Sequence, residues 1–435
     1  VSNIAENELL SRDGEESGYH GYFTHNYNSA DPHYGTKEDL INLVSTAHEK
    51  GLKVILDVVP NHTADYFNGS SSTYDSDSYQ PAAPFNNPDW YHHFGDITDW
   101  SDENQVLNYD LGGLDDLNQD NPDARQAIKD AYKAWVEDTG ADGVRIDAAR
   151  SLPKDFIQEF ENYLGVPSFG EIFVGDVDYV SDFSNYEWGV LDFPLFFQAR
   201  EVFAHDASFT TVKSIFDQDS KYNDVNHLVT FIDNHDRDRF LCLADDNYQK
   251  LRLALTFIFT VRGIPDVYYG TEQNCYGGGV PTEWAGIANK ENREVMPGFD
   301  EDGITFKYIQ RLTELRKEYA CLQTGTQREM WAEDNIYAFS RRDDSNGQEI
   351  ISVFNNGTSN ETRAIPLRAE SSLAVGTTLT NLLDTSVTAT VEAGGITGKV
   401  LNLTIPAKTA WVFTSDNVAD YAPPARTVTT IRVHY

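Results

Sequence analysis

The 435-residue chain is poor in cysteine, in basic residues and in long apolar runs. Its cysteines, Cys242, Cys275 and Cys321, are too few and too scattered for a disulfide framework or a zinc site with CxxC spacing. No apolar run approaches the roughly 18 residues that a membrane span requires. Only 33 bases accompany 69 acids, and a formal net charge of −36 repels phosphate backbones and anionic lipid. We therefore expect no nucleic-acid or membrane partner and a neutral substrate.

The acidity is uneven along the chain. No Lys or Arg occurs between Lys53 and Arg125, whereas Asp and Glu accumulate there. Hard cations such as calcium suit a segment of this kind. A solvated acidic surface explains most of these acids equally well.

Short β-branched runs alternate with helical periodicity from Gly35 onward. The residues 36–51 carry a capping pattern, an apolar stripe and a terminal glycine, and 121–140 repeat this arrangement, so both are predicted helices. Strands are predicted at residues 53–57, 143–147, 167–173, 189–193, 227–232 and 264–269. This alternation is typical of a parallel sheet in an α/β fold.

Polar residues lie at or just past the carboxyl ends of four predicted strands: Asp57, Asp147, Glu171 and Asp236. A (β/α)₈ TIM barrel builds its active site at that edge. A doubly wound sheet is the alternative, but its ligand usually occupies a single switch point. The distribution over four strands favours the barrel.

The barrel is expected to be interrupted and followed by other domains. Residues 1–62 and 121–323 form the predicted barrel, and 63–120 form an excursion domain after the third strand, because such a long connection is uncommon as a bare loop. Residues 324–415 change to a period of two and predict a C-terminal antiparallel β-sandwich domain. Residues 416–435 are interpreted as a linker and the start of a further module. The first two barrel strands are not evident in residues 1–18, so we expect the chain to be the later part of a longer polypeptide.

Two acids of different length, Asp147 and Glu171, are predicted on adjacent strands. Like charges and burial raise the pKa of at least one acid in such a group, and one ionised nucleophile beside one protonated donor is the glycosidase pair. Arg145 lies two residues before Asp147, on the same face of the strand, and favours ionised Asp147 as the nucleophile. Glu171 is then the acid/base. Asp236 is a candidate for binding sugar hydroxyls.

A single Asp or His at the end of a strand usually has a structural role. The interpretation as an active site therefore depends on the occurrence of polar residues at four predicted strand ends. His62 and His235 are further candidates for binding sugar hydroxyls. The motif YHGYF at residues 19–23 is typical of an edge strand, but Tyr22 is equally a candidate for stacking on a sugar ring.

The clusters, in this order, resemble the α-amylase family of retaining glycoside hydrolases and transglycosidases over roughly residues 1–415. The similarity is carried by YHGYF, AHEKGLKVILDVVPNHT, GVRIDAAR, GEIFVG, VTFIDNHDRDRF and YYGTEQ. These motifs are most similar to those of cyclodextrin glucanotransferases and maltogenic amylases. The resemblance implies Asp147 as nucleophile, Glu171 as acid/base and Asp236 as transition-state stabiliser.

The resemblance also implies binding residues. The subsite at the cleaved bond is assigned to His20, Tyr22, His62, Arg145 and His235. A more distant glucose is assigned to Arg293 and to Glu291, which stands where the family more often has Asp. Phe173 is expected at the acceptor side, and Asn61 and Asp116 match the family's structural calcium site.

Two departures from the family pattern affect the acceptor side. Arg150 and Ser151 stand where relatives commonly have a Lys-His pair that serves the acceptor sugar and, through a backbone carbonyl, calcium. No aromatic residue of the excursion segment matches the ring around which cyclising enzymes wrap the glucan, so cyclisation is the less favoured hypothesis.

Three functional hypotheses follow. The first is a secreted, extracellular and monomeric α-1,4-glucan hydrolase that cleaves starch and malto-oligosaccharides through a covalent glucosyl-enzyme. The second is a transglycosylase of the same family, in which a sugar hydroxyl replaces water. The third is a glucan-binding protein without turnover, which the presence of Asp147, Glu171 and Asp236 disfavours.

Overall fold

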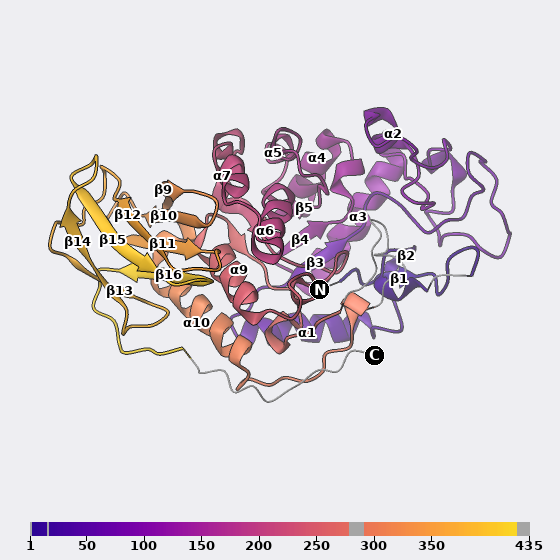
Figure 1. Ribbon diagram of the computed structural model, residues 1–435. Helices are drawn as coiled ribbons and strands as arrows, with labels where there is room; N and C mark the ends of the chain where they lie inside the picture. The colour runs from indigo at the N-terminus through magenta and orange to yellow at the C-terminus, as the bar shows by residue number, and fades with distance from the viewer. Residues whose placement is uncertain (1, 15–16, 278–290, 424–435) are drawn as a thin grey trace. The chain divides into compact units, whose positions relative to one another are not determined.

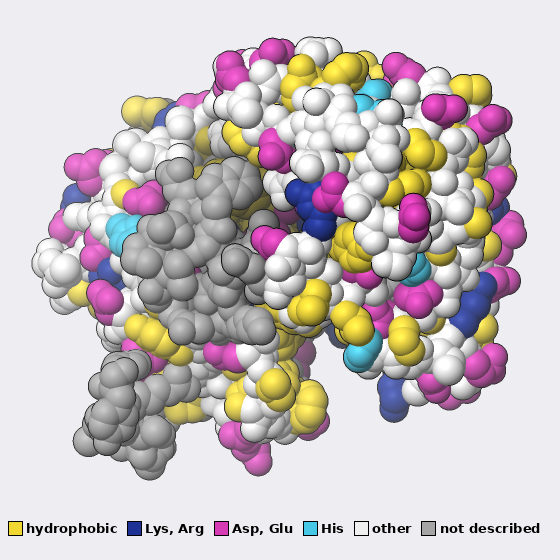
Figure 2. Space-filling model, turned by 90° about the vertical axis from the view of Figure 1, so that its right-hand side faces the viewer, with side chains coloured by type: hydrophobic (Ala, Val, Ile, Leu, Met, Phe, Trp, Pro, Cys, Tyr) yellow, Lys and Arg dark blue, Asp and Glu magenta, His cyan; other side chains and the backbone are white. Residues whose placement is uncertain are grey.

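The structure, a computed structural model, describes residues 2–14, 17–277 and 291–423. Its internal contacts divide the chain into two compact units, Val1–Leu191 and Asp192–Tyr435. None of the helices in the described part of the chain combines the length and the apolar character that crossing a bilayer demands. On the face shown in Figure 2, Asp and Glu side chains are spread widely and Lys and Arg are sparse, as the net charge leads one to expect.

The first unit is built on a parallel sheet. Its strands follow one another along the chain and pair in parallel in that order: β3 (Ile55–Val58), β4 (Gly143–Ile146), β5 (Ser168–Gly170) and β6 (Gly189–Leu191). The helices that alternate with them are α1 (Lys37–Glu49), α3 (Pro122–Thr139), α4 (Lys154–Leu164) and α5 (Val177–Phe183) (Figure 1). Every residue of β4 and β6 is buried, as in a sheet covered on both faces. The predicted α/β barrel class is confirmed.

The helix ends coincide with capping residues that the sequence displays. Thr36 and Asp39 form a reciprocal capping box at the start of α1. Asn121 accepts hydrogen bonds from the first amides of α3, and Gly140 ends that helix with φ of 73°. From α3, the Tyr132 hydroxyl accepts a hydrogen bond of 2.8 Å from the amide that follows β3, which ties the helix to the end of that strand.

The N-terminal residues form a hairpin-like pair and a turn. Strand β1 (Ala5–Asn7) pairs antiparallel with β2 (Thr24–Ala30). Between them, the 3₁₀ turn η1 (Gly18–His20) is followed by Gly21, whose φ of 92° favours glycine. A Cβ atom at Gly21 would also lie 2.9 Å from the Asn3 carbonyl oxygen. The edge-strand alternative for YHGYF is therefore wrong, because the backbone turns at this point.

The excursion segment, residues 63–120, contains little regular structure. Its elements are the 3₁₀ turn η2 (Pro88–Trp90) and the short helix α2 (Glu103–Asn108). A cluster of rings packs around Phe67, with centroid distances of 4.6 Å to Tyr74, 5.1 Å to Tyr91 and 4.8 Å to His93. Aromatic packing of this kind gives an irregular segment a small core.

The second unit begins with further parallel strands and helices. Its parallel strands are β7 (Leu228–Thr230) and β8 (Ile264–Pro265). Its helices are α6 (Phe193–His205), α7 (Thr210–Phe216), α8 (Phe240–Leu243), α9 (Tyr248–Thr260), α10 (Ile304–Glu318) and α11 (Ala320–Thr324). The 3₁₀ turns are η3 (Ala149–Ser151) in the first unit and, here, η4 (Asp219–Lys221), η5 (Val225–His227), η6 (Thr271–Gln273) and η7 (Glu291–Arg293).

The C-terminal part is an antiparallel sheet, as predicted. In spatial order it contains β12 (Glu361–Pro366), β15 (Lys399–Ile405), β14 (Thr388–Ala393), β13 (Thr378–Asn381), β16 (Thr409–Thr414), β11 (Glu349–Asn355), β10 (Ile336–Arg342) and β9 (Thr326–Ala332). Side chains from all eight strands share one apolar core, so the sheet folds over itself as a sandwich does. A turn with Lys408 at φ 49° separates β15 from β16. Of the predicted linker and module start at 416–435, residues 424–435 lie outside the described residues.

A buried ion pair in the second unit gives a stability prediction. Asp192 and Arg262 contact each other with side chains 0% and 1% exposed, and Asp219 lies 2.9 Å from the same guanidinium. Burial opposes the charge of Arg262, but the two carboxylates raise its pKa. We expect Asp192→Asn to lower the free energy of unfolding by about 3 kcal/mol, the low end for breaking a buried pair, since Asp219 remains. Denaturant titration measures this.

The matched control for this prediction is Asp217→Asn. Asp217 pairs with Lys213 at 2.6 Å on the surface of α7, and its side chain is 58% exposed. Its loss should change the free energy of unfolding by less than about 1 kcal/mol. Equal effects of the two substitutions would contradict the importance of the buried pair.

Candidate active site

Three acids and one arginine meet at the carboxyl edge of the first unit's sheet. Asp57 of β3 lies in register with Arg145 of β4. Asp147 and Glu171 are the first residues beyond β4 and β5, and their amides donate to carbonyls of the neighbouring strands at 2.8 and 2.9 Å. The strand ladder therefore sets the positions of these residues before any side chain contact is made.

The guanidinium of Arg145 joins all three acids. Its Nη1 lies 2.7 Å from Oδ1 of Asp57 and 2.7 Å from Oδ1 of Asp147, and its Nη2 lies 2.8 Å from Oε2 of Glu171. Oε2 of Glu171 also accepts a hydrogen bond of 3.3 Å from the amide of Ala148. The spacing of Arg145 and Asp147 in the sequence predicted their contact. The contacts of Arg145 with Asp57 and Glu171 were not predicted.

The group is poorly exposed to solvent. Arg145 and Asp147 are each 8% exposed. Burial works against the charge of Arg145, but Asp57, Glu171 and Asp147 raise its pKa well above the usual value. Its positive charge lies against all three carboxyl groups. One cation facing three acids leaves the site acidic, which suits a neutral or cationic ligand.

Tyr22, His20 and His62 surround this group from the turn and from the β3 end. The Tyr22 hydroxyl donates to Oδ2 of Asp57 at 2.8 Å, and its amide donates to Nδ1 of His20 at 3.0 Å. The rings of His20 and Tyr22 are stacked, with centroids 5.6 Å apart. Burial lowers the pKa of His62 to about 4, against a backbone hydrogen bond with Tyr22 that raises it. His62 is therefore neutral near pH 7 and can donate or accept a hydrogen bond.

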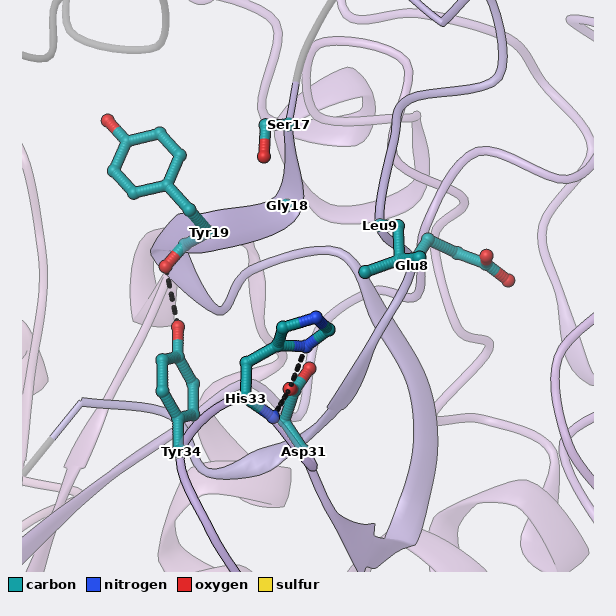
Figure 3. A pocket seen from close by; sticks show the side chains of 8 residues that line it. All are labelled: Glu8, Leu9, Ser17, Gly18, Tyr19, Asp31, His33 and Tyr34. Carbon is teal, nitrogen blue, oxygen red and sulfur yellow. Dashed lines mark hydrogen bonds and ion pairs between the residues drawn. The ribbon is translucent and has the colours of Figure 1, made fainter.

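The turn that carries His20 is anchored beside a small cavity of about 180 Å³ (Figure 3). Here the Tyr34 hydroxyl donates to the Tyr19 carbonyl at 2.5 Å. Next to it, Asp31 accepts hydrogen bonds of 2.8 Å from the amide of His33 and 3.0 Å from that of Asn7. Hydrogen bonds from β1 and from the residues after β2 thus fix the surroundings of η1.

A second acidic group lies in the second unit, after β7. Oδ1 of Asp236 is 2.9 Å from Nη2 of Arg293, and Oδ2 is 3.2 Å from Nε2 of His235. The Nε of Arg293 donates to the His235 carbonyl at 2.9 Å. Asn292 donates to the same carbonyl at 2.7 Å and is 1% exposed. The resemblance gave Arg293 a role at a distant sugar, whereas here it contacts Asp236.

Asn61 and Asp116 meet where the excursion segment returns to the end of β3. The Leu117 amide donates to the Asn61 carbonyl at 2.9 Å, and His92 contacts Oδ2 of Asp116 at 2.6 Å. Oδ1 of Asn61, Oδ1 of Asp116 and Oε1 of Gln119 are buried and have no hydrogen-bond partner among the described residues. Buried acceptor oxygens without donors are the arrangement that a hard cation satisfies. No group of three His, Cys, Asp or Glu side chains suited to a metal occurs in the described ranges, so carbonyl and amide oxygens would have to complete a site.

The other residues singled out by sequence have less defined surroundings. Phe173 is half-buried two residues beyond Glu171. The side chain of Glu291 lies outside the described residues.

Sequence reasoning gave no role to a stack of rings in the excursion segment. Phe94 lies between His92 and Tyr109, with centroid distances of 5.8 and 5.3 Å, and is 55% exposed. Tyr109 is distant from the other two along the chain, so residue spacing carried no signal for this stack.

Known proteins share sequence and fold with this chain. The model of the Alpha-amylase family, catalytic domain, matches residues 10–302. A Beta/alpha-amylase of Paenibacillus polymyxa is 38% identical over 92% of this chain and 32% of its own length. A cyclomaltodextrin glucanotransferase of a Bacillus species (strain 38-2) is 33% identical over 93% of this chain and 57% of its own. The chain thus spans less than two thirds of either relative.

A solved structure has the same fold. An α-amylase from Geobacillus thermoleovorans, crystallised with acarbose, superposes with a TM-score of 0.79 at 30% identity and covers 95% of this chain and 86% of its own. The matched family model and the shared fold lead to one conclusion: this chain belongs to the α-amylase family.

Proposed function

We propose that this protein is a retaining α-1,4-glucan hydrolase that cleaves starch and malto-oligosaccharides through a covalent glucosyl-enzyme. The observation that supports the proposal most directly is the guanidinium of Arg145, which contacts Asp147 and Glu171 at once. Retaining enzymes use carboxyl groups about 5 Å apart. A shared guanidinium favours a short separation of this kind.

In the first step, a carboxylate oxygen of Asp147 attacks the anomeric carbon. Glu171 gives its proton to the glycosidic oxygen, the carbon–oxygen bond breaks, and the shortened glucan leaves with that proton. The product is an ester between Asp147 and the glucosyl residue. Arg145 contributes by keeping Asp147 ionised before the attack.

In the second step, Glu171 acts as a base. It takes a proton from water, the oxygen attacks the anomeric carbon, and the ester bond to Asp147 breaks. This restores the carboxylate of Asp147 and the proton of Glu171, with net retention. The contacts of Glu171 with Arg145 and with the Ala148 amide fix the position of its carboxyl group for both steps.

The remaining residues would bind the substrate. Tyr22 and His20 present a stacked pair of rings, which suits the apolar face of a sugar, and neutral His62 suits its hydroxyls. We assign Asp236 the stabilisation of charge in the transition state, with His235 and Arg293 fixing its carboxylate. An acidic surface and a polymeric substrate favour a secreted monomer.

A structural calcium ion is part of the proposal. Asn61 and Asp116 would bind it through their buried Oδ1 atoms, and Gln119 offers a third oxygen in the same region. When bound, calcium supplies positive charge to buried oxygens and joins the excursion segment to the end of β3. Within the excursion segment, the Thr63 amide donates a backbone hydrogen bond of 3.1 Å to the Asp115 carbonyl and brings the two ends of that segment together.

Removal of calcium is expected to lower the melting temperature. An ion present at 1,000 times its dissociation constant stabilises a protein by about 4 kcal/mol, so the melting temperature with 1 mM CaCl₂ should exceed that with EDTA by several degrees. In Asp116→Ala this difference should vanish. Asp89→Ala, an exposed acid of the same segment, serves as the control and should keep it. An equal response of all three proteins would argue against the site.

A transglycosylase is the second candidate. The stack of His92, Phe94 and Tyr109 offers an exposed apolar surface on the excursion segment, which could bind an acceptor glucan. The similarity to a cyclomaltodextrin glucanotransferase points the same way.

Chromatography of starch digests tests the proposal. Linear malto-oligosaccharides with rising reducing ends support hydrolysis, whereas cyclic or disproportionated products support transfer. Binding of starch without release of any sugar would contradict both and would indicate a glucan-binding protein. Proton NMR of the first product tests retention, because the α-anomer must appear before mutarotation.

A further inference from the structure

Arg150 connects three separate segments of the first unit. Its guanidinium carbon lies 5.0 Å from the ring centre of Trp100 and 5.5 Å from that of Tyr179. Its Nη2 donates a hydrogen bond of 2.9 Å to the Trp100 carbonyl. Trp100 belongs to the excursion segment and Tyr179 to α5, whereas Arg150 lies in η3 beyond β4. We call Arg150, Trp100 and Tyr179 the Arg150 clasp.

The clasp is supported on its Tyr179 side. The Tyr179 hydroxyl donates to Glu103 of α2, at 3.1 Å to Oε1 and 3.0 Å to Oε2. Lys154 of α4 lies 5.8 Å from the same ring. Two points of the excursion segment, Trp100 and Glu103, are thereby connected to η3 beyond β4 and to α5 beyond β5.

The clasp borders the candidate acid/base. The Arg150 amide donates to the carbonyl of Glu171 at 3.2 Å. In a retaining enzyme, the acid/base lies on the side of the leaving group, where the acceptor of the second step also enters. A wall at this position therefore affects which molecule, water or a sugar, reaches the glucosyl-enzyme.

Arginine suits these contacts better than lysine. A planar guanidinium can stack against two rings and still donate in its own plane to a carbonyl, whereas an ammonium group is a compact and strongly hydrated charge. In this chain the guanidinium contacts protein rings and a protein carbonyl.

We propose that Arg150 is a positioning residue that fixes Trp100 of the excursion segment beside the acceptor side, and so sets the share of glucosyl-enzyme that passes to a sugar instead of to water. The inference rests on the proposed function, since it concerns the second step of that reaction. The inference goes beyond the proposed function because it assigns the choice between hydrolysis and transfer to a contact between the excursion segment and the end of β4.

The test compares the wild type, Arg150→Lys, Arg150→Ala and the control Arg125→Ala, each acting on 2-chloro-4-nitrophenyl maltotrioside with added maltose. Arg125 also lies near an aromatic ring, at 5.3 Å from Phe156, but belongs to α3. Phenol release measures the first step, and chromatography measures transfer products against hydrolysis products. Melting curves show whether each variant is folded. If Arg150→Ala does not fold, Arg150→Lys, which keeps the charge, still tests the inference.

We expect both Arg150 variants to lower the transfer share about fivefold, the loss of a partly desolvated cation–π contact. The maltose concentration for half-maximal transfer should rise, while phenol release at saturating maltotrioside changes less than about threefold. Arg125→Ala should match the wild type. Unchanged transfer shares in active Arg150 variants, or full rescue by lysine, would overturn this inference alone. No release of phenol or sugar by the wild type would overturn the proposed function and this inference with it.

Discussion

A Glu171→Gln variant should lose about 10²–10⁴-fold in kcat on starch, the usual contribution of a general acid/base. Glutamine keeps the size of the side chain and can still contact Arg145, but it has no proton for the glycosidic oxygen. Binding of malto-oligosaccharide should survive, so the dissociation constant should change far less than kcat. Release of reducing ends and calorimetric binding measure the two quantities.

The role of Glu171 is resolved by changing the leaving group. A 2-chloro-4-nitrophenyl maltoside needs little protonation, so the variant should release a burst of phenol equal to the enzyme concentration and then stall. Azide needs no base and should restart turnover, forming the α-glycosyl azide. Glu137→Gln, on the exposed side of α3, is the matched control and should behave as wild type. Equal losses on both substrates would contradict an acid/base role for Glu171.

Much of the barrel could be predicted because local signals and tertiary structure agree. Thr36, Asn121 and Gly140 act as caps where the sequence suggests them. The strands that end near Asp57 and Asp147 pair as neighbours, since apolar runs between helices leave few other topologies. The positions of the acids followed from these strand ends.

Contacts between distant segments could not be predicted in the same way. The approach of Arg145 to Glu171 depends on the register of β4 and β5, and that of Arg150 to Trp100 on the path of an irregular segment. The turn at Lys408 could not be predicted, because alternating hydrophobicity continues through it. The antiparallel strands β9 and β12 consist mostly of half-buried and exposed residues, which leaves a weak pattern in the sequence.

Arg145→Gln should raise the pH at which the enzyme becomes active. Without the cation, Asp57, Asp147 and Glu171 face one another at low exposure, so like charge and burial raise their pKa values. The nucleophile must be ionised, so the acidic limb of kcat/KM against pH should move upward by about one unit or more. Arg145→Lys keeps the charge but lacks the planar guanidinium that contacts both Asp147 and Glu171. The acidic limb of its pH profile should therefore move less than that of Arg145→Gln.

The same substitution should make stability depend on pH in a defined direction. In the variant, the folded acids have pKa values above the unfolded values of about 4. They contribute full stability below those values and lose it as the pH rises through the raised values of the folded state. The wild type, with Arg145 8% exposed and paired, should lack this loss. The difference in unfolding free energy between wild type and Arg145→Gln should therefore widen from pH 4 to pH 8, towards the roughly 3–5 kcal/mol of a broken buried pair. A constant difference across denaturant titrations at pH 4, 6 and 8 would show that the three acids do not depend on this guanidinium for their charge.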